Sequence, residues 1–483
     1  MVIVFALVAL LVVAVLVTAN WFVWRRLFRD TTRGPGRIRR AGAVLIAGGW
    51  ALTVGALVAE RGGAPFWLQQ TLAWPGFLWL ALSLYLVLAV LAGELVRPLL
   101  RRFLERRAAG TAAHRPSPEP QPVTAGAPVR TAGPRPGAAQ GEAERERGAE
   151  ATEGSLEAGS APHPEPAPAE PQGRTAPAPP QPAPTPGATP PSGPAADPSG
   201  ATTGPAPTGP SRRLFVSRVV AGAAAAAAAG TVGYGTYGVL RGPRVKRVTV
   251  PLAKLPRGAH GYRIAVVSDI HLGPVLGRGF AQKVVDTINA TQPDLIAVVG
   301  DLVDGSVKNL GPAAAPLAQL SARHGAYFVT GNHEYFSGAE QWVEEVRRLG
   351  LRPLENARTE LPHFDLAGVN DVAGEQEGQG PDFARALGDR DRARACVLLA
   401  HQPVQIHEAV EHGVDLQLSG HTHGGQLWPG NLLAAAANPT LAGLERYGDT
   451  QLYVSRGAGA WGPPTRVGAP SDITVIELAS RQA

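Results

Sequence analysis

The sequence has a single cysteine among its 483 residues, and this scarcity excludes two kinds of framework. One thiol cannot form an internal disulfide, and it cannot supply the several thiolates of a cysteine-based zinc site. Cys396 lies in the apolar run Ala395-Cys396-Val397-Leu398-Leu399, so we expect a small buried core residue there. Because a chain without disulfides can work in either redox compartment, cysteine usage leaves its location open.

Aromatic residues are also scarce, at 6% of the chain, and they do not alternate with basic residues in the C-terminal half. A nucleic-acid surface usually combines the two, so we expect no nucleic-acid partner despite the formal net charge of +6. Many of the arginines instead flank apolar segments, where membrane orientation accounts for them.

Three N-terminal segments, at 2–24, 42–59 and 74–96, are apolar over the roughly 20 residues that a membrane-spanning helix needs. The loop between the second and third segments holds only Arg61. The first loop is far richer in arginine, with Arg25, Arg26, Arg29, Arg33, Arg37, Arg39 and Arg40. The positive-inside rule therefore predicts a membrane region over residues 1–107, with the first loop inside and the second outside.

Residues 108–210 contain few large apolar residues and many prolines, so we predict a disordered linker there. Residues 211–247 then begin with Ser211-Arg212-Arg213 and continue as an alanine- and glycine-rich apolar stretch. This pattern is similar to a twin-arginine export signal, and equally to a fourth membrane helix. Both alternatives predict a cell-membrane protein whose C-terminal domain is extracytoplasmic, although Arg241 and Arg244 follow the stretch on that side.

Residues 248–483 have an ordinary globular composition in which apolar runs alternate with helical periodicity. This alternation predicts an α/β domain with largely parallel central strands, built as two packed sheets between helices. The expected strands are 263–268, 294–299, 326–330, 364–369, 395–400, 416–419, 452–455 and 473–478. The expected helices are 278–291, 313–322 and 339–349.

Metal-ligand residue types follow five of the predicted strands. They are Asp269 and His271, Asp301, Asn332 with His333 and Glu334, His401, and His421 with His423. Because side chains that follow strand C-termini converge on one crevice of an α/β sheet, we expect a common site. Carboxylate and imidazole with one amide suit two divalent ions of manganese, iron or zinc. Such a site makes a hydroxide nucleophile at neutral pH and clamps a phosphoryl group.

The order of these blocks resembles the calcineurin-like metallophosphoesterase superfamily over roughly residues 248–480. The longer strings 419–426, 455–457 and 461–464 are similar to a bacterial subgroup of twin-arginine-exported, membrane-associated phosphoesterases. They are also similar to enzymes that act on UDP-2,3-diacylglucosamine. The resemblance implies a four-layer α/β/β/α sandwich. It also implies two ligand sets that share Asp301, one with Asp269, His271 and His423, the other with Asn332, His401 and His421.

Several further residues border this set. His333 follows the ligand Asn332 and is the candidate to protonate the leaving oxygen, with a structural role as the alternative. Glu334 and Asp304 are expected to orient histidines or to cap turns. Arg456 is a candidate contact for the substrate phosphate, with an ion pair inside the protein as the alternative.

The sequence thus predicts a membrane-anchored phosphoesterase that cleaves phosphodiester or lipid-linked bonds with a metal-bound hydroxide as nucleophile. An apolar segment with Trp428, Leu432 and Leu433 follows the last motif, and it would either admit an acyl chain or form an ordinary buried loop. The alternative function is a catalytically inactive membrane sensor or scaffold built on the same fold. A transporter agrees poorly with three or four spans in which Glu94 is the only acidic residue.

Overall fold

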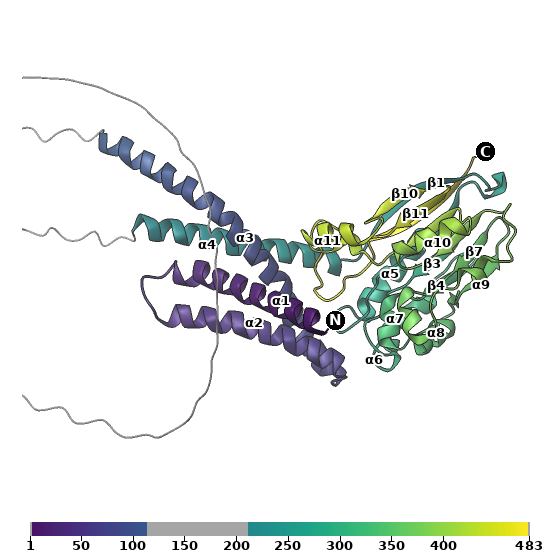
Figure 1. Cartoon of the computed structure of the whole chain (residues 1–483), viewed down its shortest axis with the longest axis horizontal. Helices are drawn as coiled ribbons and strands as arrows, with labels where there is room; N and C mark the ends of the chain where they lie inside the picture. Colours follow the sequence, from purple (N-terminus) through teal and green to yellow (C-terminus); the bar gives the residue numbers. More distant parts are fainter. Residues whose placement is uncertain (1, 114–210, 482–483) are drawn as a thin grey trace, which may run out of the picture. The chain divides into compact units, whose positions relative to one another are not determined.

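The computed structural model describes residues 2–113 and 211–481. Its first part consists of long helices, α1 (Val2–Trp24), α2 (Arg37–Arg61), α3 (Phe66–Ala113) and α4 (Arg212–Leu240) (Figure 1). A π-helical turn at Arg25–Arg29 continues α1. Each of the four helices contains a stretch long and apolar enough to cross a membrane. The sequence predicted the first three of these spans and offered the fourth as one of two alternatives.

The helices extend beyond the predicted spans. Helix α3 runs to Ala113, so residues 108–113, which the sequence assigned to the linker, are helical. The rest of the predicted disordered linker, 114–210, lies outside the described residues.

Small residues let the long helices approach one another closely, as is usual between membrane helices. A Cβ atom on Gly76 of α3 would stand 2.7 Å from the carbonyl oxygen of Leu52 in α2. Thr53 closes the same contact, because its hydroxyl donates to the carbonyl oxygen of Gly76 at 2.8 Å. Gly93 plays the same part between α3 and α4, where a Cβ would meet Val220 at 2.8 Å.

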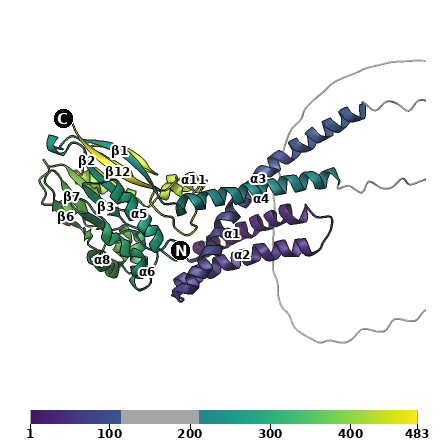
Figure 2. The ribbon, with the colours of Figure 1, turned by 180° about the vertical axis from the view of Figure 1, so that it is seen from behind.

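The remaining chain forms two six-stranded mixed sheets (Figures 1 and 2). The first has the order β1-β12-β2-β3-β4-β5, with β1 Arg244–Leu252, β12 Asp472–Ser480, β2 Tyr262–Val267, β3 Leu295–Val299, β4 Ala326–Val329 and β5 Arg352–Pro353. The second has the order β10-β11-β9-β8-β7-β6, with β10 Gly443–Tyr447, β11 Thr450–Val454, β9 Leu416–Ser419, β8 Cys396–Leu399, β7 Asp365–Gly368 and β6 Ala357–Glu360. The pairs β2–β3–β4 and β7–β8–β9 are parallel, as predicted.

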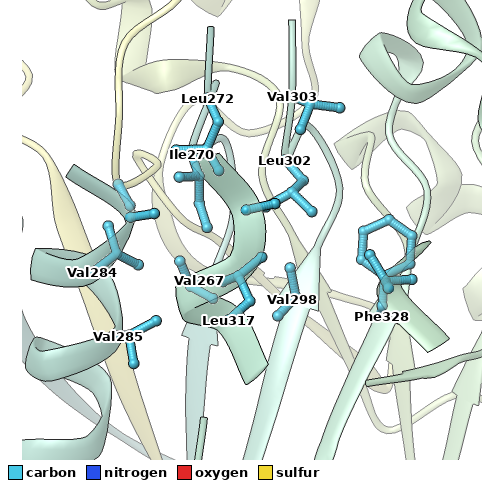
Figure 3. Packing of buried hydrophobic residues seen from close by; sticks show 14 of the residues in the cluster. Val267, Ile270, Leu272, Val284, Val285, Val298, Leu302, Val303, Leu317 and Phe328 are labelled. Carbon is cyan, nitrogen blue, oxygen red and sulfur yellow. The ribbon is translucent and has the colours of Figure 1, made fainter. Parts of the chain in front are cut away.

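Three apolar layers hold the two sheets between helices, which makes the predicted α/β/β/α sandwich. One layer packs the first sheet against α5 (Arg278–Ala290), α6 (Val307–Ala314) and α8 (Ala339–Arg348). Figure 3 shows part of it, with Val267 and Val298 of adjacent strands beside Leu317. The second layer fills the space between the sheets, and the third packs the second sheet against α9 (Phe383–Leu387) and α10 (Ile406–Glu411). Cys396 is buried in this third layer, as expected.

The sequence analysis missed the strands β1, β5, β6 and β10, and it misplaced the start of the catalytic domain and the bounds of one helix. Strands β5 and β6 are short and partly polar, and β10 is largely exposed, so none of them shows a buried-strand pattern. Strand β1 begins at Arg244, so the predicted domain boundary at 248 cuts through it. The helix predicted at 313–322 starts earlier, as α6, and ends in a 3₁₀ turn at Ala315–Gln319. The short helices α7 (Asn332–Ser337), α9 and α11 (Gly430–Ala437) were also not predicted.

Candidate metal centre

The predicted ligand residues come from both sheets, and each follows the C-terminal end of a parallel strand. Asp269 and His271 follow β2, Asp301 follows β3, Asn332 follows β4, His401 follows β8, and His421 and His423 follow β9. Backbone bonds join the blocks, because the Asp269 N–H donates to the Gly300 carbonyl at 3.1 Å and the Gly420 N–H donates to the His401 carbonyl at 2.9 Å. The two sheets therefore bring side chains that are far apart in the sequence into one site.

The backbone of the site is strained at most of the ligand positions. Asp269, His271, Asp301, His421 and His423 all have φ between 48° and 72°, in the left-handed region that non-glycine residues seldom adopt. Glycine is required beside them, since a Cβ on Gly300 would stand 2.5 Å from Nδ1 of His401. Such strain persists only where packing imposes it, and it concentrates at functional sites.

The first group of potential ligands contains Asp269, His271 and His423, all buried. Nε2 of His423 lies 2.9 Å from Nε2 of His271 and 3.4 Å from Oδ1 of Asp269. Oδ1 of Asp269 accepts from the His421 N–H at 2.9 Å, which fixes the carboxylate against the next motif. Oδ2 of Asp269 is buried and has no hydrogen-bond partner among the described residues.

The second group contains Asp301, His401 and His421. Nδ1 of His401 lies 2.9 Å from the Val299 carbonyl oxygen, so this nitrogen donates and leaves Nε2 to face Oδ2 of Asp301 at 3.1 Å. Nε2 of His401 is buried and makes no hydrogen bond with any described residue. Asn332 joins the group, since its Oδ1 lies 3.0 Å from Nδ1 of His421.

Asp301 lies between the two groups. Its Oδ2 is 3.1 Å from His401 of the second group and 3.9 Å from His271 of the first. Burial by itself would raise the pKa of Asp301, but the neighbouring His401 outweighs burial and holds that pKa well below its usual range. Burial likewise opposes the charged form of His401, yet Asp301 raises the pKa of His401 well above its usual range. The carboxylate thus favours positive charge beside it.

A single carboxylate, Asp304, holds two histidines. Its Oδ1 lies 2.8 Å from Nδ1 of His271 and 2.7 Å from Nδ1 of His333. Both rings therefore direct Nε2 away from Asp304. Burial would lower the pKa of His333, but the hydrogen bond to Asp304, with the charges of Asp304, Asp301 and Glu334, raises it to about 9. His333 is 14% exposed, so a molecule in the site can reach it.

Glu334 holds the backbone under the site and contacts no ligand atom. Its fully buried carboxylate accepts from the N–H groups of Asp301 at 2.9 Å, Leu302 at 2.8 Å and Gly331 at 2.6 Å. It thereby ties the turn after β3 to the turn after β4. This is the turn-capping role expected for Glu334.

The donors fit divalent cations of the borderline class. Two buried ligand atoms, Nε2 of His401 and Oδ2 of Asp269, have no hydrogen-bond partner, and such atoms are costly unless something binds them. Burial first, and then neighbouring positive charge, lowers the pKa of His421 to about 4, so this imidazole stays neutral as a ligand must. A mixture of carboxylate, imidazole and amide suits manganese, iron or zinc better than calcium or magnesium.

Sequence reasoning missed Arg466, which touches the ligand shell directly. One guanidinium nitrogen lies 3.1 Å from Nδ1 of His423, and another donates to the His423 carbonyl at 3.1 Å. Because a guanidinium only donates, Nδ1 of His423 accepts, and Nε2 is the ring nitrogen that would face a cation. Arg456, the predicted phosphate contact, instead lies 3.9 Å from Asp472, which favours the ion-pair alternative.

The membrane helices also contribute a charge that the sequence analysis missed. Glu60, at the end of α2, interacts electrostatically with Asp304 and His333. Nothing in the sequence signals this, because the glutamate lies more than 200 residues from both partners. The C-terminal end of α2 therefore lies near Asp304 and His333.

Exposed apolar side chains surround the mouth of the site. The rings of Phe336 and Trp461 stand 5.5 Å and 5.7 Å from the His333 ring, and they are 75% and 57% exposed. Leu432 and Leu433 of α11 are 65% and 78% exposed, so the buried-loop alternative is wrong for them. Next to α11, the Trp428 carbonyl accepts from the Tyr85 hydroxyl of α3 at 2.9 Å.

Comparison with known proteins matches part of the chain to one protein family. The model of the calcineurin-like phosphoesterases matches residues 262–425, which contain all seven predicted ligands. A transmembrane protein with a metallophosphoesterase domain from Danio rerio is 38% identical over 51% of this chain and 59% of its own length. An uncharacterised metallophosphoesterase of Aquifex aeolicus is 35% identical over 49% of this chain and 92% of its own length.

Other matches are partial. An uncharacterised metallophosphoesterase of Helicobacter pylori is 38% identical over 50% of this chain, which spans 66% of that protein. Among solved structures, a dimetal phosphatase from Danio rerio aligns with 44% of this chain and 91% of its own, with a TM-score of 0.32 and 13% identity. The alignments with these three relatives each cover about half of the chain.

Proposed function

Because this chain belongs to the metallophosphoesterase family, we propose that it is a membrane-anchored phosphoesterase that uses two divalent cations to cleave phosphodiesters of membrane lipids. The observation that carries this proposal is the place of Asp301. Its carboxylate stands between two groups of buried ligand atoms. A carboxylate shared by two ligand sets is what a two-metal clamp on a phosphoryl group requires.

Two sets of four ligands account for the seven predicted donors. One cation would be held by Asp269, His271, Asp301 and His423, and the other by Asp301, Asn332, His401 and His421. Two of the three groups of potential ligands among the described residues support this division, and the third, His271, Asp304 and His333, shares His271 with the first. The contact between Asn332 and His421 adds the amide to the second set. Manganese, iron and zinc are the ions that the donor set favours.

When bound, two such cations activate water for attack on phosphorus and neutralise the charge on the phosphoryl oxygens. His333 supplies the proton for the leaving oxygen. Its Nδ1 is held by Asp304, and its raised pKa of about 9 keeps the ring protonated near neutral pH. Arg466 and Asp304 position His423 and His271 through the ring nitrogens that do not face the cations.

The surroundings of the site support a lipid substrate. Leu427 and Val467, which flank the site, pack with the membrane-helix residues Val23, Ala81 and Tyr85. The exposed leucines of α11 follow Leu427 in the chain by five and six residues. A lipid could keep its acyl chains against this apolar rim while its phosphoester enters the polar site.

The helices also support a topology with the catalytic domain outside. Helix α4 has 29 residues, so at ~1.5 Å per residue it is longer than the ~30 Å hydrocarbon core. Arg213 at its start lies among the arginines of the first loop, and Thr236 near its end bonds to Thr465 of the catalytic domain at 2.7 Å. If the arginine-rich end faces the cytoplasm, the domain lies on the other side.

Metal analysis with turnover tests the enzymatic proposal. The full chain, purified in detergent and loaded with manganese, should hold two ions and hydrolyse bis-p-nitrophenyl phosphate. An Asp301→Asn variant should lose one or both ions and nearly all activity, while an exposed-site control, Glu344→Gln, should keep both. Two ions without turnover on any phosphoester would instead support the inactive sensor or scaffold.

The lipid proposal is tested by replacing an exposed leucine of α11. Leu433→Lys should reduce the hydrolysis of a phosphodiester lipid in vesicles at least about tenfold, because inserting a charge into the apolar region costs ~2.5–3.5 kcal/mol. Hydrolysis of soluble bis-p-nitrophenyl phosphate should be unchanged. Val410→Lys, at an exposed site on α10, is the matched control. Equal losses on both substrates would contradict the lipid proposal.

The orientation can be measured with a single introduced thiol. Burial raises the pKa of Cys396 to about 12, so the native thiol is inert toward maleimides. A membrane-impermeant maleimide should label Glu344→Cys in intact cells and should label Arg106→Cys only after the membrane is opened. The reverse pattern would show the catalytic domain to be cytoplasmic. Export by a twin-arginine signal stays a separate prediction.

A further inference from the structure

A second polar cavity lies among the membrane helices, and none of the candidate metal ligands lines it. Its volume is about 410 Å³, and its walls come from the turn after α1, the following loop, α2, α3 and the start of α4. The lining residues are Arg26, Arg29, Asp30, Thr32, Arg33, Arg39, Arg97, Arg101, Ser211, Arg213, Leu214 and Ser217. Seven of these twelve residues are arginines, against one carboxylate.

Part of this positive charge is neutralised within the protein. Arg26 bonds to Asp30 at 2.8 Å and to Glu94 at 2.6 Å. Arg97 lies 3.3 Å from Glu94. Among residues 2–113 and 211–481, no carboxylate pairs with the other lining arginines, namely Arg29, Arg33, Arg39, Arg101 and Arg213. The cavity therefore keeps a large excess of positive charge.

Two of these arginines are built into the walls. The Arg97 side chain is only 7% exposed, yet its Nε has no hydrogen-bond partner among the described residues, and neither has Nε of Arg101. Glu94 compensates the charge of Arg97, whereas among the described residues no carboxylate pairs with Arg101, and a buried guanidinium nitrogen without a partner favours an anion beside it. Arg39 holds the shape of the cavity, because it donates to the Thr32 hydroxyl at 2.8 Å and to the Arg29 carbonyl at 3.1 Å.

Membrane orientation alone does not require this arrangement. The positive-inside rule is satisfied by arginines that point from a loop into water. Here arginines from four separate segments converge on one cavity, and Arg97 is buried to do so. The planar fork of a guanidinium matches the oxygens of a phosphate, and several such forks in one cavity are typical of phosphate recognition.

We propose that this arginine cavity binds the phosphate groups of an anionic ligand. The cavity lies at the ends of membrane helices, where lipid headgroups are found, and basic pockets of this kind hold anionic headgroups. A soluble polyphosphate offers the same chemistry to the same arginines. Arg213 follows the start of α4, so the ligand would also tie α4 to the loop between α1 and α2.

The test uses the full chain in neutral detergent micelles, with two probes. Micelles doped with phosphatidylglycerol or with phosphatidylcholine report on a lipid headgroup, and inorganic pyrophosphate reports on a soluble anion. Native mass spectrometry measures retained ligand, and the midpoint of thermal unfolding measures stabilisation. Retention of phosphatidylglycerol over phosphatidylcholine assigns the lipid source, and stabilisation by pyrophosphate alone assigns the soluble source. Equal behaviour with all probes overturns the proposal.

A matched pair of variants separates the cavity from general surface charge. Arg101 lines the cavity, whereas its neighbour Arg102 is exposed and does not. Arg101→Gln should weaken retention of the preferred probe about fivefold, the effect of about one basic residue on an anionic headgroup, and Arg102→Gln should leave it unchanged. Arg97→Lys, which keeps the charge but loses the fork, should fall between wild type and Arg97→Gln. Equal losses for Arg101→Gln and Arg102→Gln would overturn the proposal.

Discussion

Replacing Glu334 should loosen the metal centre without touching a metal ligand. The carboxylate accepts three backbone N–H groups, two of them at Oε2 and one at Oε1. In Glu334→Gln the amide oxygen can take the place of Oε2 and keep the bonds to Asp301 and Gly331. The amide NH₂ group then faces the N–H of Leu302, so one buried donor loses its acceptor.

The size of the effect follows from this count. An unsatisfied buried donor costs about 1–3 kcal/mol, so Glu334→Gln should destabilise the chain by about 1–3 kcal/mol and Glu334→Ala by about 3–9 kcal/mol. Part of the loss in both variants is offset, because burial and the charge of Asp301 raise the pKa of Glu334 to about 7 and so disfavour its carboxylate. At roughly 2–4 °C per kcal/mol, the glutamine variant should unfold about 2–12 °C lower.

Metal affinity should fall with stability, because the turns that carry Asp301 and Asn332 lose a common support. Loss of a group that supports a ligand typically costs about 10–100-fold in affinity. Thermal unfolding of the metal-free chain and equilibrium dialysis with manganese measure the two effects separately. Glu344→Gln, an exposed change on α8, controls for charge. If Glu334→Gln matched Glu344→Gln in both assays, the turns would have to be held by other contacts.

Three further changes probe single contacts, each with its own measurement. His333→Ala should slow the hydrolysis of an alkyl phosphodiester about 10²–10⁴-fold. It should slow the hydrolysis of bis-p-nitrophenyl phosphate far less, since p-nitrophenolate leaves without a proton. Equal losses on the two substrates in steady-state assays would exclude a general acid. Arg466→Gln should weaken manganese binding about 10–100-fold by dialysis, and rescue by Arg466→Lys would show that charge alone matters. Gly235→Ala places a Cβ 2.7 Å from the Arg466 carbonyl oxygen and should lower the unfolding midpoint, whereas Gly233→Ala on the same helix has open space and should not.

The sequence indicated the candidate ligands because their chemistry and their local structure coincide. Asp269, Asp301 and His421 each follow an apolar run that is a parallel strand, so the position of the strand fixes the position of the side chain. The central strands were predicted for the same reason, since burial on both faces leaves a continuous apolar run. Strand β6 sits at a sheet edge with intermediate burial, and its residues Ala357–Glu360 show no such run.

Arg466 could not be found in this way. It lies in a stretch of glycines and prolines without periodicity, and its contact with His423 exists only because β9 and the segment after β11 meet. Arg456, ten residues earlier, carries the same charge in a motif and attracted the prediction instead. One sequence gives residue types but not which of two arginines faces the ligands.

The sequence alone also does not show where the arginines near the membrane lie in the folded chain. Counted along the chain, Arg26, Arg97 and Arg213 only indicate which helix ends lie inside. In the folded chain α4 connects two polar centres, because Arg213 near its start lines the arginine cavity and Gly235 near its end accepts from the Arg466 N–H at 3.4 Å. The Arg466 side chain in turn contacts His423. An anchor that served only to hold an enzyme at a membrane would need neither contact, so α4 is a structural part of the metal centre as well as a membrane span.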